Sequence, residues 1–371
     1  MSKARPFEKN PFKFGSIVDE PYFTNRTTEI STIKSILNSD NHLILISPRR
    51  FGKTSLVQKI IKGGTRPSIY LDLQLVTSAE DFASQLLRKL YRIYPFEKIK
   101  QQIKNFRILP NISLNPINSE VEISFHPAPS KLALIEDVLN LIENISKKGN
   151  RTVVVLDEFQ EIKSIEKDLD RHLRSTIQHH QKISYVFLGS QEHLMRDIFE
   201  LKKSPFYHFG YLMLLDKIPY PEFLTYLSER FSIIAKESEI IATKILEITK
   251  SHPFYTQQLA FTLFELIIKK GNSSNVLEKG IEDILQIHDM DFERLWNRLN
   301  RTDMKVLIGM TQSEYSPLSA RFSKINNIDS SSTIFSSLKR LAQNGMVIKT
   351  ATGYEIDDPF FKKWIKKRRS N

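Results

Sequence analysis

Eight residues between an apolar run and a helical pattern constrain this chain more than any other segment. They read Ser47-Pro-Arg-Arg-Phe-Gly-Lys-Thr54 and follow the unbroken apolar run 42–46. A short apolar run of this kind is typical of a parallel strand buried on both faces. A strand, a loop ending in glycine, lysine and threonine, and then a helix together indicate a phosphate-binding loop.

The residue types of the loop suit a nucleotide. Gly52 lets the main chain approach phosphate oxygens, and the helix starting near Lys53 directs its positive dipole end toward the anion. We expect Lys53 to reach the β- and γ-phosphates and Thr54 to supply a hydroxyl ligand to Mg²⁺. The predicted nucleotide contacts of the loop are Ser47, Pro48, Arg49, Arg50, Phe51, Gly52, Lys53, Thr54 and Ser55. Ser47 replaces the first glycine of the pattern, and its Cβ restricts the backbone where the loop begins.

Two carboxylates, Asp157 and Glu158, follow the apolar run 152–156. Parallel α/β sheets place their ligands at the carboxyl ends of strands. We therefore expect Asp157 to hold Mg²⁺ and Glu158 to act as the catalytic base on the attacking water. Ser190 follows the next apolar run, and it is either a catalytic group beside the γ-phosphate or part of a simple turn.

The order of apolar runs predicts the fold class. Further runs at 68–73, 185–188 and 211–215 alternate with helical patterns. This alternation predicts an α/β fold, a doubly wound parallel sheet of the P-loop NTPase type, over residues 1–216. Prolines and alternating apolar residues at about 106–130 predict an inserted hairpin or loop.

The strand pattern stops after residue 216. Apolar spacing at three and four residues predicts a helical lid domain at 217–287, with helices near 223–234, 240–248, 255–268 and 276–287. Two helical patterns near 303–311 and 331–344, followed by a predicted hairpin at 346–356, indicate a winged-helix domain at 288–371.

Charge and composition limit the partners. Lysine and arginine number 54 against 42 aspartates and glutamates, an excess of 12 that favours polyanions. From Ile287 onward we count 15 basic and 9 acidic residues, so the winged helix could contact DNA phosphates. Its reading face offers few arginines or amides for base edges, which favours docking on a protein over DNA.

Cysteine is absent, and no apolar run is long enough to cross a bilayer. These absences exclude thiolate metal sites and predict a cytoplasmic protein without a membrane partner. Arg171 and Arg174 lie on a predicted helix, where they either act on the nucleotide of a neighbouring copy, which implies self-association, or form a solvated face.

Several segments resemble one known family. They are Phe23-Thr-Asn-Arg26, the phosphate loop, Leu156-Asp-Glu-Phe-Gln160, Ser251-His-Pro-Phe-Tyr-Thr-Gln257 and Tyr354-Glu-Ile-Asp-Asp-Pro-Phe360. Together they look like the archaeal-type ATPase family, which belongs to the signal-transduction ATPases with numerous domains (STAND) near the AAA+ proteins. The resemblance spans nearly the whole chain.

The resemblance implies that the nucleotide is ATP, exchanged with ADP. It also implies that Phe23 and Arg26 line the adenine side and that Pro253 belongs to a lid motif packing on the nucleotide. Ser251 stands where this motif usually has glycine. His252 is either part of that motif or a capping or core histidine. Proteins of this family behave as switches in which the lid and winged helix sit differently with ATP and ADP.

These observations together predict a slow ATPase with Mg²⁺ as its metal, acting as a switch toward an unknown protein partner. The alternative is a winged-helix protein whose DNA binding is gated by ATP. A third hypothesis, a sensor that binds ATP without hydrolysing it, conflicts with a carboxylate at Glu158.

Overall fold

The computed structural model describes residues 9–104, 106–114, 121–125, 131–147, 149–271, 275–350 and 353–369. The chain divides into two compact units. The sheet unit comprises Arg26–Ser47 and Lys53–Asp216, and the helical unit comprises the residues up to Asn25, Pro48–Gly52 and Lys217 onward. The phosphate loop is therefore divided between the two units.

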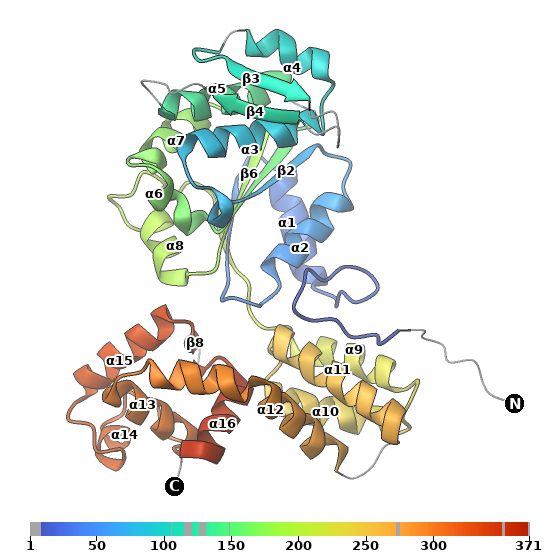
Figure 1. Ribbon diagram of the computed structural model, residues 1–371, viewed down its shortest axis with the longest axis vertical. Helices are drawn as coiled ribbons and strands as arrows, with labels where there is room; N and C mark the ends of the chain where they lie inside the picture. Colours follow the sequence, from blue (N-terminus) through green and yellow to red (C-terminus); the bar gives the residue numbers. More distant parts are fainter. Residues whose placement is uncertain are drawn as a thin grey trace, which may run out of the picture. The chain divides into compact units, whose positions relative to one another are not determined.

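The sheet unit contains a five-stranded sheet, order β2-β5-β6-β1-β7, in which every pairing is parallel. The strands are β1 Leu43–Ile46, β2 Ser68–Asp72, β5 Thr152–Asp157, β6 Ile183–Gly189 and β7 Tyr211–Leu214. Each coincides with a predicted apolar run, so the predicted α/β fold with a parallel sheet is confirmed. Figure 1 shows the strands in the middle of this unit with helices around them.

The position of each strand follows from its side chains. β1, β5 and β6 are buried along their whole length because they are interior strands covered on both faces. β7 is an edge strand and exposes Tyr211 and Leu214. The register pairs Asp72 with Asp157, so the carboxyl ends of β2 and β5 meet at one edge of the sheet.

Helices surround the sheet. They are α1 Thr27–Asn38, α2 Lys53–Lys62, α3 Ala79–Tyr91, α4 Phe96–Ile103, α5 Lys131–Ile145, α6 Ile162–Ile165, α7 Leu169–Ile177 and α8 Glu192–Phe199, with short 3₁₀ turns η1 Leu73–Leu75 and η2 Phe159–Glu161. The core between α3, α5 and the sheet consists of fully buried aliphatic and aromatic side chains, among them Phe82, Leu134 and Tyr185. α2 begins at the last residues of the phosphate loop and so places them at a helix N-terminus.

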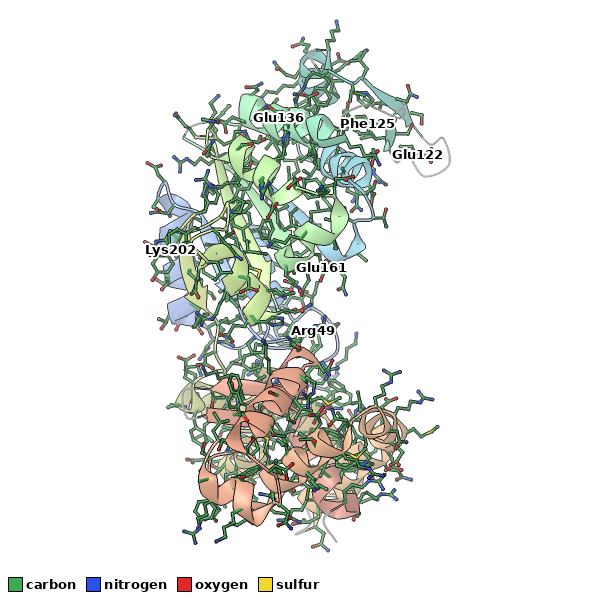
Figure 2. All side chains as sticks on the ribbon, turned by 90° about the vertical axis from the view of Figure 1, so that its left-hand side faces the viewer. Arg49, Glu122, Phe125, Glu136, Glu161 and Lys202 are labelled. Carbon is green, nitrogen blue, oxygen red and sulfur yellow. The ribbon has the colours of Figure 1, made fainter. Side chains whose placement is uncertain are left out.

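The insertion predicted at about 106–130 contains a hairpin of β3 Pro110–Leu114 and β4 Val121–Phe125, which pair antiparallel. The residues that join the two strands lie outside the described ranges. Glu122 and Phe125 lie on β4, and Glu136 lies on α5 (Figure 2). Arg107 joins the insertion to α5 through ion pairs with Glu136 and Asp137, both at 2.8 Å.

The helical unit has its own core. Its elements are α9 Tyr220–Phe231, α10 Ser238–Thr249, α11 Pro253–Lys270, α12 Val276–Asn297, α13 Arg301–Gln312, α14 Ala320–Ile325, α15 Ser331–Gln343, β8 Val347–Thr350, β9 Gly353–Ile356 and α16 Pro359–Arg369. Phe12, from the N-terminal end of the described chain, is buried in this core against Tyr226, Phe231 and Phe264. The N-terminal segment therefore belongs structurally with the C-terminal half.

Three features of the helical unit differ from the sequence prediction. α12 continues past the expected domain boundary at residue 287, because Phe292 and Trp296 continue its buried face. α14 forms where a polar turn was expected, capped by the Ser319 hydroxyl, which accepts from the Phe322 N–H. α16 forms from the basic C-terminal segment. The turn of the predicted hairpin, residues 351–352, lies outside the described ranges, and the three-domain division stays a prediction.

Within the described residues, no helix combines the length and apolar character that a bilayer crossing requires.

Candidate active site at the carboxyl end of the sheet

The phosphate loop adopts the backbone that its glycine permits. Gly52 has φ of +89°, a conformation that costs glycine little and other residues more. Ser47 is absent from the residues with positive φ, and its N–H donates to the Gly189 carbonyl at 3.2 Å, continuing the sheet. A serine at the first position therefore imposes no backbone strain, contrary to the restriction expected from its Cβ.

Lys53 lies among carboxylates. Its Nζ is 2.7 Å from Glu158 Oε1 and 3.4 Å from Asp157 Oδ1. The residue is only 8% exposed, so its charge is balanced by these two acids rather than by bulk water. The lysine from the start of α2 and the two acids from the end of β5 thus form one cluster, as the sequence predicted.

The Thr54 hydroxyl donates to Asp157 Oδ2 at 2.8 Å. The Tyr70 hydroxyl from β2 donates to the same oxygen. Burial, and then the negative charge of Asp157, raise the pKa of Tyr70, so this hydroxyl stays protonated and remains a donor. Asp157 is therefore held in one orientation by two hydroxyls.

Glu158 occupies a left-handed backbone conformation, with φ of +51°, directly after β5. Its Oε2 accepts hydrogen bonds from the Ser190 hydroxyl at 2.6 Å and from the Gln160 amide. Burial of the carboxyl favours its neutral form, but the adjacent Lys53 charge and these hydrogen bonds outweigh burial and lower the pKa of Glu158. The side chain is thus ionised and oriented, which a proton acceptor requires.

The donor set fits a magnesium ion. Hydroxyl and carboxylate oxygens are the ligands that Mg²⁺ prefers, and octahedral bonds of about 2.0–2.1 Å place neighbouring ligand oxygens about 2.9 Å apart. The Thr54 and Asp157 oxygens are 2.8 Å apart, which matches adjacent corners of such an octahedron. Among the described residues, no group of three or more histidine, aspartate or glutamate side chains could hold a metal by itself. Phosphate and water oxygens would therefore complete the coordination.

Sequence reasoning missed two members of the cluster. Tyr70 was read only as part of a strand, although its half-buried hydroxyl is of a kind that usually has a hydrogen-bond partner. Gln160 was quoted only as part of a family motif, two residues after Glu158. Ser190 was predicted either beside the γ-phosphate or in a simple turn, and its hydroxyl donates to Glu158 Oε2 at 2.6 Å.

The middle of the loop lies in the helical unit. Arg49, labelled in Figure 2, is exposed. The Arg50 Nη1 donates to the Tyr255 hydroxyl at 3.1 Å, and its guanidinium lies 4.7 Å from the Phe254 ring centroid. Phe51 is buried, with its ring centroid 4.8 Å from that of His252. These contacts of Arg50 and Phe51 are with protein groups.

The lid motif begins α11. Pro253 is at the first helical turn, a position that tolerates its missing N–H. Ser251 has φ of +56°, which explains why glycine is usual there. His252 is 1% exposed, and its ring lies 4.4 Å from that of Tyr255 between centroids. His252 is therefore a core residue at the start of the helix.

The two residues expected at the adenine side fall in different units. Phe23 belongs to the helical unit, and Arg26 to the sheet unit. Arg26 precedes α1 with φ of +53° and forms an ion pair of 2.6 Å with Glu29. Two arginines of α7 were considered as groups that act on the nucleotide of a neighbouring copy. Of these, Arg174 stacks on the Phe209 ring, 4.2 Å from its centroid, and Arg171 forms an ion pair with Asp168 at 3.3 Å.

Two family models match the chain. A family model described as an ATPase domain predominantly from Archaea matches residues 23–259, and a model of a probable winged helix domain matches residues 290–367. An uncharacterized ATP-binding protein of Methanocaldococcus jannaschii is 26% identical over 163 residues, which cover 39% of this chain and 45% of that protein. The match thus spans less than half the length of this curated relative.

Two solved structures share the fold. The Walker-type ATPase of Pyrococcus abyssi has 16% sequence identity and a TM-score of 0.68, over 96% of this chain and 99% of that one. The ORC2 protein of Aeropyrum pernix in its ADPNP-ADP complexes has 16% identity and a TM-score of 0.52, over 96% of each chain.

Proposed function

The chain belongs to the family whose ATPase domain is found predominantly in Archaea, and from this premise we propose that it binds Mg-ATP, hydrolyses it slowly and acts as a nucleotide-dependent switch. In this proposal the nucleotide state sets the positions of the lid and winged helix, which a protein partner reads. The observation that carries the proposal is the cluster of Lys53, Thr54, Asp157 and Glu158.

Each residue of the cluster has one role in the proposal. Lys53 would exchange its carboxylate partners for the β- and γ-phosphates when ATP enters, because α2 presents it together with the backbone N–H groups of its first turn. Thr54 and Asp157 would hold Mg²⁺, which neutralises phosphate charge and aligns the phosphates. The other nucleotide contacts proposed are Ser47, Pro48, Arg49, Arg50, Phe51, Gly52, Ser55, Phe23, Arg26 and Pro253.

Glu158 would act as the general base. Once Lys53 engages phosphate, Glu158 Oε1 loses its ion-pair partner, while Oε2 stays oriented by Ser190. The carboxylate then has a free oxygen with which to accept a proton from water. Ser190 acts here through Glu158 and is a positioning residue.

The test of the site is Lys53→Ala. ATP affinity measured by calorimetry should fall by about a hundredfold or more, because charged hydrogen bonds to phosphate contribute about 1.5–3 kcal/mol each. Lys62→Ala removes an exposed lysine at the other end of α2 and should leave the affinity unchanged. An affinity for ATP that Lys53→Ala leaves intact would refute nucleotide binding at this loop.

The partner is proposed to be a protein rather than DNA. Basic side chains of the winged helix are already paired: Arg340 with Asp303 at 2.7 Å, Arg368 with Asp289 at 3.0 Å, and Arg369 with Glu293. Charges neutralised inside the protein add little to phosphate binding. The alternative of ATP-gated DNA binding rests on the winged-helix fold itself and on exposed Lys339 and Lys349.

A titration of labelled duplex DNA at low salt separates the two. We expect no binding by fluorescence anisotropy and no change of ATPase rate with DNA. A DNA affinity that falls steeply with added salt and is lost in Lys339→Ala would favour the alternative.

A further inference from the structure

Three acidic side chains at the end of β9 lie against the lid within the helical unit. Glu355 forms ion pairs with Lys217 and, at 3.6 Å, with Lys250. The Asp357 Oδ1 lies 3.4 Å from the Nε2 of buried His252. Each acid of this wing end therefore faces a residue in the lid or in the segment leading to it.

The third acid, Asp358, connects in two directions. Its Oδ1 accepts from the backbone N–H groups of Phe360 and Phe361, at 2.8 and 3.1 Å, and so caps the first turn of α16. The ring of Tyr255 in the lid packs edge-on against Phe360 of this turn, with ring centroids 6.0 Å apart, and the charge of Asp358 acts on the Tyr255 hydroxyl. Burial raises the pKa of Asp358, whereas these hydrogen bonds and the positive charge of Arg50 oppose that rise.

Arg50 reaches the same hydroxyl from the phosphate loop. Its Nη1 donates to Tyr255 at 3.1 Å, and the Phe254 and Tyr255 rings lie 4.7 and 5.9 Å from its guanidinium. Arg50 thus contacts Tyr255, and Tyr255 contacts the first turn of α16, which Asp358 caps.

The backbone of Arg50 is unusual. Its φ is +67°, a left-handed conformation that costs energy for any residue except glycine and persists where the surroundings hold it. The contacts of its side chain with the lid are the visible restraint. A perturbation of these contacts would thus change the shape of the loop, and a change in the loop would strain the contacts.

We propose that Arg50 is a positioning residue that transmits the nucleotide state of the phosphate loop to the winged helix through Tyr255 and Asp358. The inference rests on the proposed function, because it requires nucleotide in the loop. When nucleotide is bound, its phosphate oxygens compete with the Tyr255 hydroxyl and the Asp358 carboxylate for interaction with the Arg50 guanidinium. Only such a difference in contacts between two states shifts their equilibrium.

The chain carries a probe at the far end of this connection. Both of its tryptophans lie in the helical unit: Trp364 in α16, five residues after Pro359, where the capped turn begins, and Trp296 in α12. The Trp364 indole donates to Asp289 at 2.7 Å. Intrinsic tryptophan fluorescence therefore reports on α16 and its packing, without any signal from the sheet unit.

The experiment compares ADP binding, measured by calorimetry, with the change in tryptophan emission at saturating ADP. Arg50→Gly removes the side chain but keeps a residue that adopts positive φ freely. Because Arg50 is also one of the proposed nucleotide contacts, each variant is saturated with ADP, and the emission change of Arg50→Gly at saturation should drop to about a fifth or less of the parent's. Tyr255→Phe removes only the hydroxyl and should reduce the emission change similarly. Lys62→Gln removes one positive charge from the far end of α2, outside the proposed nucleotide contacts, and should keep the response.

Two results would overturn the inference. One is a parent-like emission change in Tyr255→Phe at saturating ADP, and the other is a parent protein that binds ADP with no change in emission. A parent that fails to bind ADP in calorimetry would sink the proposed function as well, so the two failures are distinguishable.

Discussion

Replacing Glu158 by glutamine removes one charge from the cluster while keeping the shape of the side chain. In the parent, Oε2 accepts from Ser190 and Gln160, and Oε1 lies 2.7 Å from Lys53 Nζ. The amide of glutamine has a single acceptor oxygen, which the two donors at the Oε2 position would take. Its NH₂ would then face Lys53, donor against donor, and the lysine would lose this partner.

Two effects of opposite sign follow for Glu158→Gln. Loss of a general base lowers turnover by about 10²–10⁴-fold, which corresponds to about 2.7–5.5 kcal/mol in the barrier. Release of Lys53 favours phosphate binding, because ATP no longer competes with the carboxylate for it. ATP affinity should therefore be equal to or higher than that of the parent.

The unfolding free energy supplies a second readout. A hydrogen bond to a charged group contributes about 1.5–3 kcal/mol, and the Asp157 carboxylate 3.4 Å from Lys53 would compensate part of the loss. We expect the variant without nucleotide to be about 1–2 kcal/mol less stable. ATP at a hundred times its Kd adds about 2.7 kcal/mol and should restore the melting temperature.

The assay is phosphate release under single-turnover conditions, with ATP affinity measured separately. Glu161→Gln is the matched control, since Glu161 is three residues away on η2, carries the same charge and has no contact with Lys53. Turnover in Glu158→Gln within about tenfold of the parent would refute the assignment of Glu158 as the base.

Three further predictions concern the metal, acid and the C-terminal helix. Asp157→Asn should raise the Mg²⁺ concentration needed for half-maximal turnover by about tenfold or more, and an unchanged Mg²⁺ titration would exclude Asp157 as a ligand. The pKa of Glu158 is lowered from 4.5, so its ionised carboxylate stabilises the folded protein above that pH, and this contribution is lost as the pH falls through the folded-state pKa. The difference in unfolding free energy between the parent and Glu158→Gln, measured in urea, should therefore shrink toward pH 3. A difference that stays constant with pH would contradict this prediction. Asp289→Asn should destabilise the protein by about 1 kcal/mol, since it weakens the hydrogen bond to Trp364 and the exposed ion pair with Arg368, with a shift of tryptophan emission as the check.

The sheet could be predicted because its strands are unbroken apolar runs. In a parallel sheet, the ligand-binding and catalytic residues usually lie at the carboxyl ends of the strands. Asp157 and Glu158 were located by this rule alone. Tyr70 could not be located in the same way, because its contact with Asp157 depends on which strand pairs with β5 and in which register. Strand order is a tertiary property that alternation of apolar residues does not encode.

The C-terminal helix was missed for a different reason. Six lysines and arginines within residues 359–369 indicated a solvated tail. The same segment buries Phe360, Phe361, Trp364 and Ile365 on one face, a helical spacing that the charges obscured. Three of its cations, Lys367, Arg368 and Arg369, are paired with acids on α12, a helix distant in the sequence. The direction of Arg50 was equally unreadable, because a long side chain on a loop follows its tertiary partners.

One continuous helix, α12, runs from the lid into the winged helix without a flexible joint. Its 22 residues form a rod about 33 Å long. A rod of this length turns a small tilt at one end into a large shift at the other: a tilt of about 10° displaces the far end by about 6 Å, by simple leverage on that length. In the proposed switch, a small tilt of α12 at its lid end would therefore displace the winged helix by several ångströms, and a partner bound there would respond to movements too small to be noticed beside the nucleotide.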